Sequence, residues 1–472
     1  MKIALINLNR YNNGDTPPLN LISIATYLNK HLNFCDIKIF DVNFDDVVLS
    51  VKLFEPDLIG FSAMTVDYAL AIEISKKIKL FKDIPIVIGG VHISTLPVSM
   101  DRSFDIGVIG EGEETILELV KLYNKNNKFD NKTLSKVKGI IFRDSEGKLV
   151  INKRRDPIYP LDKLPMLDKS LIDKRYLKKK VLPDGSYGVL AHLLTSRGCP
   201  YKCVFCSTSV FWGNKLRYHS PERIASEILD YIKNYNASYI IIWDDLFAYK
   251  KIIRELRDVF RKYKIKIPLT CNLRANLVDD ELCVLLKEMG VVRVGFGFES
   301  GSSRYLKYLK AGSVTLDDIH KAILTCKKHG LFIGGSLIFG GPGETLDDMK
   351  DTLKLIDFMI DNGVDNVWSF VMTPFPGTEI WEIAKKRGKV NDFQMDWSLL
   401  SHQNMNNPTL LDDNISIDDF KSVFIQSRIK QQHFRWKKIK YDIVHNPFSI
   451  LKGIFKKPEI LYGLLFKKPI KE

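Results

Sequence analysis

Three cysteines stand in one short run of the chain, Ser196-Arg197-Gly198-Cys199-Pro200-Tyr201-Lys202-Cys203-Val204-Phe205-Cys206. Their spacing brings three thiolates close together, and three thiolates can bind three irons of a [4Fe–4S] cluster. Such a cluster commonly has four cysteine ligands, so here the fourth iron would be open to a small molecule. The alternative is a zinc site. Zinc sites usually have a second cysteine pair or histidines nearby, and the nearest histidine downstream is His219.

The cysteine run directly follows an apolar segment in a region of alternating strand and helix patterns. Six strands are predicted, at residues 190–195, 239–243, 268–272, 293–298, 332–339 and 366–372. Six strand–helix units are typical of a partial (β/α)6 barrel of the TIM type, whose reactive loops follow the carboxyl ends of the strands. We therefore expect the cysteine run to be an active-site loop.

The cysteine spacing resembles that of the radical S-adenosylmethionine (radical SAM) superfamily. In that family the open iron holds the amino and carboxylate groups of S-adenosylmethionine, and reduction of the cluster releases a 5′-deoxyadenosyl radical. Motifs at the later strand ends extend the resemblance, among them Gly297-Phe298-Glu299-Ser300-Gly301 and Pro374-Phe375-Pro376-Gly377-Thr378. The resemblance implies that Cys199, Cys203 and Cys206 bind the cluster. It also implies a set of residues that hold S-adenosylmethionine: Phe205, Asp244, Asp245, Arg274, Glu299, Ser336 and Ile338.

Within this set the roles are of different kinds. An aspartate is expected to accept from the amino group of S-adenosylmethionine or the substrate, because an anion beside an ammonium is favourable in a dry site. The sequence does not decide between Asp244 and Asp245. Simpler roles remain open, namely core packing for Phe205, helix capping for the aspartates and surface solvation for Arg274.

The first part of the chain, residues 1–125, also alternates strands and helices. Strands are predicted at 2–7, 36–40, 58–62, 84–88 and 106–109, with helices at 19–32 and 69–81. This order predicts a doubly wound parallel sheet, which binds ligands beyond the carboxyl ends of its strands.

Those strand ends resemble the cobalamin-binding Rossmann-like domain. The matching residues, which the resemblance implies to be cobalamin-binding, are Ser62, Met64, Gly89, Gly90, Gly110 and Glu111. A hydroxyl can bond the buried heterocycle, and paired glycines allow backbone to approach it closely. The family's cobalt-ligating histidine is absent from residues 7–14, so this loop supplies no imidazole. His92 is expected to be a polar pocket or loop residue. The alternative is a sheet that keeps the fold and binds nothing.

Two further regions complete the predicted organisation. Residues 126–189 form a connector with a hairpin at 137–142 and 148–152, the barrel covers 190–388, and a mostly helical basic region covers 389–472. Residues 421–472 hold 13 Lys and Arg but three Asp and Glu, and residues 433–472 interleave bases with bulky apolar groups. This tail is expected to contact a membrane surface, to pack back on the barrel, or, least favoured, to bind nucleic acid.

The composition indicates a reducing compartment. Seven cysteines in 472 residues do not make a disulfide framework. The first residues are too short an apolar run for a signal peptide, and no apolar run is long enough to span a bilayer. We expect a cytoplasmic protein, peripheral at the inner membrane surface if the tail binds lipid.

These features together predict a cobalamin-dependent radical SAM enzyme that transfers a methyl group to an unactivated carbon, using a 5′-deoxyadenosyl radical and methylcobalamin. The alternatives are a cyclase or rearranging enzyme of the same family and a non-catalytic cobalamin- or metal-binding protein. The implied cofactors are a [4Fe–4S] cluster, S-adenosylmethionine and cobalamin. The expected partners are a small-molecule or lipid substrate and an electron donor such as flavodoxin or ferredoxin.

Overall fold

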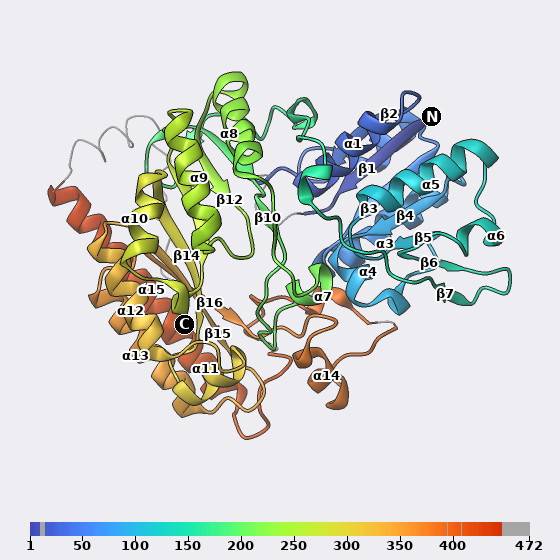
Figure 1. The fold of residues 1–472 in the computed structure, drawn as a ribbon. Coiled ribbons are helices and arrows are strands. Elements are labelled where there is room, and N and C mark those ends of the chain that lie inside the picture. The colour runs from blue at the N-terminus through green and yellow to red at the C-terminus, as the bar shows by residue number, and fades with distance from the viewer. Residues whose placement is uncertain (10–14, 394, 407, 446–472) are drawn as a thin grey trace.

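The fold consists of two α/β sheets that stand side by side and are joined by a short connecting region (Figure 1). It is known from a computed structural model that describes residues 1–9, 15–393, 395–406 and 408–445, with side chains up to residue 432. Each sheet has seven strands. This arrangement confirms the predicted fold class, an N-terminal doubly wound sheet followed by a partial barrel.

The N-terminal sheet has the strand order β2-β1-β3-β4-β5-β6-β7. Strands β1 to β5 are parallel, and all of them except the edge strand β2 are nearly continuous in apolar residues, as strands covered on both faces are. The hairpin predicted for the connector pairs antiparallel with β5 and extends this sheet. The strands are β1 (Lys2–Asn7), β2 (Asp36–Asp41), β3 (Leu58–Ser62), β4 (Ile86–Gly89), β5 (Ile106–Val108), β6 (Ile140–Arg143) and β7 (Leu149–Ile151).

Helices cover both faces of this sheet. The core on one face includes Leu21 and Leu28 of α1 with Leu119 of α5, and the core on the other includes Val51 of α2 and Ile78 of α3. The helices are α1 (Leu19–His31), α2 (Val47–Phe54), α3 (Tyr68–Lys79), α4 (Val91–Thr95), α5 (Glu113–Asn126) and α6 (Asn131–Leu134).

The second sheet is a curled half-barrel with the order β16-β15-β14-β13-β12-β9-β8. Its last six strands along the chain are parallel, and β8 pairs antiparallel with β9. A small ribbon, β10 with β11, stands between the two sheets. The strands are β8 (Lys180–Val181), β9 (Tyr187–Leu193), β10 (Ser196–Arg197), β11 (Arg217–Tyr218), β12 (Ala237–Ile242), β13 (Leu269–Leu273), β14 (Val291–Glu299), β15 (Phe332–Phe339) and β16 (Asn366–Val371).

Helices cover the outer face of the half-barrel and fix its strands. Thr315 and Thr345 form capping boxes with Asp318 and Asp348, so α12 and α13 begin where their sequences signal a start. The helices after the first six are α8 (Pro221–Tyr235), α9 (Lys250–Lys262), α10 (Asp280–Glu288), α11 (Ser303–Leu309), α12 (Leu316–Lys328) and α13 (Leu346–Asp361). Two others lie toward the N-terminal sheet: α7 (Thr208–Trp212) contacts α4, and α14 (Glu379–Lys386) packs into the core cluster that holds α2 and α3.

A long final helix, α15 (Ile417–His445), lies against α13 and the edge strand β16. Phe420 and Phe424 are buried there, and the Gln431 amide donates to Ser369 Oγ at 2.6 Å. The beginning of this helix therefore packs on the barrel. Residues 433–445 are described without side chains and residues 446–472 lie outside the described residues, so the three expectations for the tail stay predictions. Among the described helices, none is long and apolar enough to cross a membrane.

Candidate functional site

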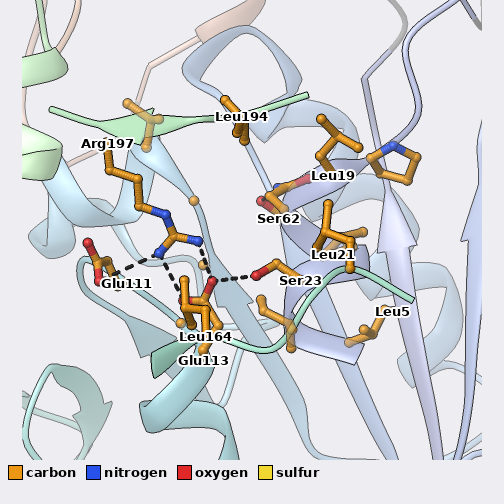
Figure 2. A pocket seen from close by; sticks show the side chains of 18 of the residues that line it. Leu5, Leu19, Leu21, Ser23, Ser62, Glu111, Glu113, Leu164, Leu194 and Arg197 are labelled. Carbon is orange, nitrogen blue, oxygen red and sulfur yellow. Dashed lines mark hydrogen bonds and ion pairs between the residues drawn. The ribbon is translucent and has the colours of Figure 1, made fainter. Parts of the chain in front are cut away.

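A cavity of about 370 Å³ lies at the carboxyl edge of the N-terminal sheet, and residues of both sheets line it (Figure 2). Apolar walls come from residues such as Leu5, Leu19 and Leu193. All six residues predicted to bind cobalamin line this cavity: Ser62, Met64, Gly89, Gly90, Gly110 and Glu111. The size and apolar lining suit the nucleotide tail of cobalamin rather than the whole cofactor.

Backbone conformation gives the cavity its shape. Gly90 has a φ of 96°, and a Cβ there would lie 2.6 Å from the carbonyl oxygen of Ala63. Gly110 has a φ of 87°, and its N–H donates to Ser94 Oγ at 2.9 Å. Ser62 Oγ accepts from the Asn20 amide at 2.7 Å. A side chain at Gly90 would displace the wall, and one at Gly110 would be strained by its positive φ, so these residues fit a flat group held closely against backbone.

A buried network of charges forms one wall of the cavity. The Arg197 guanidinium pairs with Glu113 Oε1 at 2.6 Å and with Glu111 Oε2 at 3.5 Å, and Arg217 pairs with the other oxygen of Glu111. Ser23 Oγ donates to Glu113 at 2.7 Å. Burial alone would raise the pKa of Glu113, but Arg197 and Ser23 outweigh it and hold that pKa below its usual value. Sequence reasoning missed Arg197 and Glu113 as functional candidates, although both stand inside the motifs that drew attention to their neighbours.

His92 is a correction to the sequence-based expectation. It lies in α4 and is buried in the core, where its ring stacks on Tyr68 at 3.9 Å between centroids and bonds Ser99 Oγ at 3.0 Å. Burial lowers the pKa of His92 to about 3, so the ring stays neutral. It is a packed core residue rather than a pocket or loop residue.

The three cysteines of the predicted cluster loop are half-buried, and none forms a disulfide. Among the described residues, no three His, Cys, Asp or Glu side chains are arranged to hold a single metal ion. A [4Fe–4S] cluster attaches each cysteine to a different iron, so its ligands stand farther apart than those of one zinc ion. Burial raises the pKa of Cys199 and Cys206, so iron would have to displace their protons on binding.

Arg274 braces the cysteine loop. Its Nη1 donates to Cys203 Sγ at 3.4 Å, and its guanidinium carbon lies 3.8 Å from the centroid of the Tyr201 ring. Its other terminal nitrogen donates to Ser313 Oγ. The alternative of ordinary surface solvation for Arg274 is therefore wrong, and its predicted contact with S-adenosylmethionine would be made from this braced position.

The two aspartates after β12 face different surroundings. Asp244 is fully buried and accepts from the backbone N–H and the hydroxyl of both Thr195 and Ser196. Burial raises the pKa of Asp244 to about 6, although these donors oppose the shift. Asp245 is exposed and accepts from Thr208 Oγ1 at 3.1 Å. Asp244 therefore holds the start of the cysteine loop, while Asp245 remains accessible to an ammonium group.

The remaining predicted residues lie around the mouth of the half-barrel. Glu299 ends β14 with a φ of 66°, which is uncommon for a residue with a side chain. Its carboxylate pairs with Lys310 at 2.8 Å, and that ammonium lies 5.5 Å from the Phe205 ring centroid. Phe205 and Ile338 pack against one core cluster, and Ser336 Oγ bonds the Phe296 carbonyl oxygen at 3.4 Å. Lys310 was missed in the sequence, because it lies in the turn directly after α11, in a segment with no motif.

Comparison with known proteins identifies both halves of the chain. Residues 193–356 match the radical SAM superfamily and residues 9–120 match the B12 binding domain. An uncharacterized methyltransferase of Pyrococcus horikoshii is 29% identical over 96% of this chain and 93% of its own length. A cytidylyl-2-hydroxyethylphosphonate methyltransferase of Streptomyces wedmorensis is 27% identical over 74% and 70% of the two chains. An anaerobic magnesium-protoporphyrin IX monomethyl ester cyclase of Rubrivivax gelatinosus is 24% identical over 84% and 72%.

The solved structures agree on the fold. The cobalamin-dependent S-adenosylmethionine radical enzyme OxsB, solved with aqua-cobalamin and S-adenosylmethionine, superposes with a TM-score of 0.71 over 98% of this chain and 71% of its own. The identity is 19%, so this likeness shows the arrangement of both domains and no more. Both domain matches, this shared architecture and the cysteine loop agree. The chain belongs to the cobalamin-binding radical SAM superfamily, enzymes that use a [4Fe–4S] cluster, S-adenosylmethionine and cobalamin.

Proposed function

We propose that this enzyme transfers a methyl group to an unactivated carbon of a small-molecule substrate. One observation carries the proposal: Arg197 lines the predicted cobalamin cavity and stands two residues before Cys199 of the cluster loop. This supports two cofactor sites that lie next to each other, as a reaction that uses both cofactors on one substrate requires. When bound, the cluster with S-adenosylmethionine supplies a radical that removes hydrogen from the substrate, and cobalamin supplies the methyl group.

The protein's own residues position the reactants in this proposal. Cys199, Cys203 and Cys206 hold the cluster, with Arg274 donating to the Cys203 sulfur. Asp245 accepts from an amino group at the mouth of the barrel, because Asp244 is already saturated with hydrogen bonds. The cavity walls exclude water from the buried part of cobalamin.

The first test is anaerobic purification with hydroxocobalamin supplied, followed by reconstitution with iron and sulfide. We expect about four irons and about one cobalt per chain, and 5′-deoxyadenosine after reduction with S-adenosylmethionine. Iron and 5′-deoxyadenosine without cobalt would contradict the cobalamin assignment. With a substrate in hand, a product heavier by one CH2 group supports methyl transfer, and a product without it supports the cyclase alternative.

The remaining partners are proposed on chemical grounds. Reduction of the cluster needs an electron, which we propose comes from flavodoxin or ferredoxin. Lys202 is exposed in the cysteine loop and would face such an acidic partner. A lipid substrate and a peripheral membrane contact are proposed from the basic, apolar sequence of residues 433–472.

A further inference from the structure

Four charged side chains form a buried network beside the predicted cobalamin cavity, and Figure 2 shows three of them, Glu111, Glu113 and Arg197. The side chains of Glu111, Glu113, Arg197 and Arg217 are 8%, 4%, 11% and 5% exposed. The two negative charges of the carboxylates are compensated by the two positive charges of the guanidinium groups. Breaking one member of a buried network leaves an uncompensated charge, so each partner is held closely in place.

The network joins elements that are far apart in the sequence. Glu113 lies in the first turn of α5 and is bonded to Ser23 of α1, and both helices wall the cavity. Arg197 lies in β10, whose register pairs it directly with Arg217 of β11. A change in the position of α1 or α5 therefore acts on the strand that leads into the cysteine loop.

The step from Arg197 to Cys199 passes through a constrained glycine. Gly198 has a φ of 97°, and a Cβ there would lie 2.4 Å from the carbonyl oxygen of Lys215. The chain at this point is therefore pressed against the loop that leads to β11. The backbone between Arg197 and Cys199 therefore has little freedom to move.

We propose that this network couples the two cofactor sites, so that filling the cobalamin cavity stabilises the cysteine loop and its cluster. Cobalamin in the cavity restrains α1 and α5, their restraint holds Glu113 on Arg197, and Arg197 fixes the entry to Cys199. Arg197 and Glu113 are positioning residues here, since they act through the loop. The inference rests on the proposed function for the identity of the two ligands.

The test measures how fast the reconstituted full-length protein loses iron to excess EDTA, with and without saturating hydroxocobalamin. In the wild type we expect cobalamin to slow iron loss at least about fivefold, the lower end of common couplings between sites. In Glu113→Gln, which keeps the size of the side chain, iron loss is compared at hydroxocobalamin concentrations that saturate this variant by absorption titration, and we expect bound cobalamin no longer to slow it. Glu114→Gln is the matched control, because Glu114 is in the same turn, is half-exposed and pairs with Arg155 instead.

A second variant covers the case in which Glu113→Gln fails to assemble a cluster. Arg197→Lys keeps the positive charge but loses the planar guanidinium that can bond two carboxylates at once. In this variant we expect cobalamin to slow iron loss less than it does in the wild type. Equal protection in the wild type, Glu113→Gln and Arg197→Lys would overturn the coupling. So would cobalamin that binds the wild type without slowing iron loss, and this result would leave the proposed function standing. A wild type that takes up no cobalamin would overturn both.

Discussion

The two halves of the site are built in different ways. The cobalamin cavity is shaped by backbone, through residues such as Gly89, Gly90 and Gly110, and no histidine of the first loop enters it. The mouth of the half-barrel is lined by titratable side chains, among them Cys203 and Asp245. We therefore propose that the predicted cobalamin cavity selects its ligand mainly by shape, and the mouth of the half-barrel by coordination and charge. Substitutions should therefore act through size on one side and through chemistry on the other.

Replacement of Cys203 by alanine should have the largest effect. Removing a predicted cluster ligand should lower iron to a small fraction of the wild-type content and abolish formation of 5′-deoxyadenosine. Hydroxocobalamin should still bind, because the cavity lining includes no residue of the cysteine triplet. Iron analysis, product chromatography and visible absorption of the same sample measure all three.

The control for this variant is Cys35→Ala, since Cys35 is far from the loop in sequence and unpaired. It should behave as the wild type does. A Cys203→Ala protein that keeps full iron and forms 5′-deoxyadenosine would show that the triplet does not hold the cluster.

The two neighbouring aspartates offer a comparison within one loop. Asp244→Asn should lower the free energy of unfolding by about 3 kcal/mol, because an amide offers one acceptor oxygen where several buried donors converge. Asp245→Asn should leave stability within about 0.5 kcal/mol, as exposed substitutions usually do, and should weaken binding of S-adenosylmethionine. Urea denaturation and equilibrium binding measure the two effects. The reverse pattern would exchange the roles assigned to the aspartates.

The sequence predicts most of the fold, because apolar strand patterns and strand-end motifs are local signals. β1, β3 and β15 agree with their predicted limits. Contacts between segments far apart in the chain leave no such local signal, so they could not be predicted from the sequence. The pairing of β6 with β5, the saturation of Asp244 and the ion pairs of Arg197 all join segments at least 30 residues apart. His92 was misjudged because its surroundings, rather than its neighbours in sequence, make it a core residue.

Gly90→Ala tests the shape-based half of the comparison. The new Cβ would meet the Ala63 carbonyl oxygen at 2.6 Å and its nitrogen at 2.8 Å, in a backbone region unfavourable to alanine. We expect a loss of about 2 kcal/mol in stability and about tenfold weaker binding of hydroxocobalamin. Urea denaturation measures the loss of stability, and an absorption titration measures the affinity for hydroxocobalamin.

Gly147→Ala is the matched control, with a similar φ of 80° and no atom within 4 Å of the added Cβ. Gly147→Ala should lower the free energy of unfolding by about 1 kcal/mol and leave the affinity for hydroxocobalamin unchanged. If both variants bind hydroxocobalamin equally well, close approach of backbone at Gly90 is not what shapes the site.

The contribution of a buried carboxyl can be tested at Glu344, in the loop after β15. It is buried, and its Oε2 accepts from the Gly340 N–H at 2.6 Å. Burial outweighs this bond and raises the pKa of Glu344 to about 8 from an ordinary value of 4.5. The folded chain therefore holds a proton that the unfolded chain has released. Between these two values, the contribution of this group to stability must fall as pH rises, by up to about 1.4 kcal/mol per pH unit.

Glu344→Gln removes this titration while keeping the size of the side chain. The difference in unfolding midpoint between the wild type and Glu344→Gln should change with pH from about 5.5 to about 7.5, increasingly in favour of the glutamine protein. Exposed Glu146→Gln is the control and should give a constant difference. Other titrating groups cancel in these differences, because both proteins share them. A pH-independent difference for Glu344→Gln would show that Glu344 is ionised in the folded chain, and hence that charge as well as backbone packing holds the loop after β15.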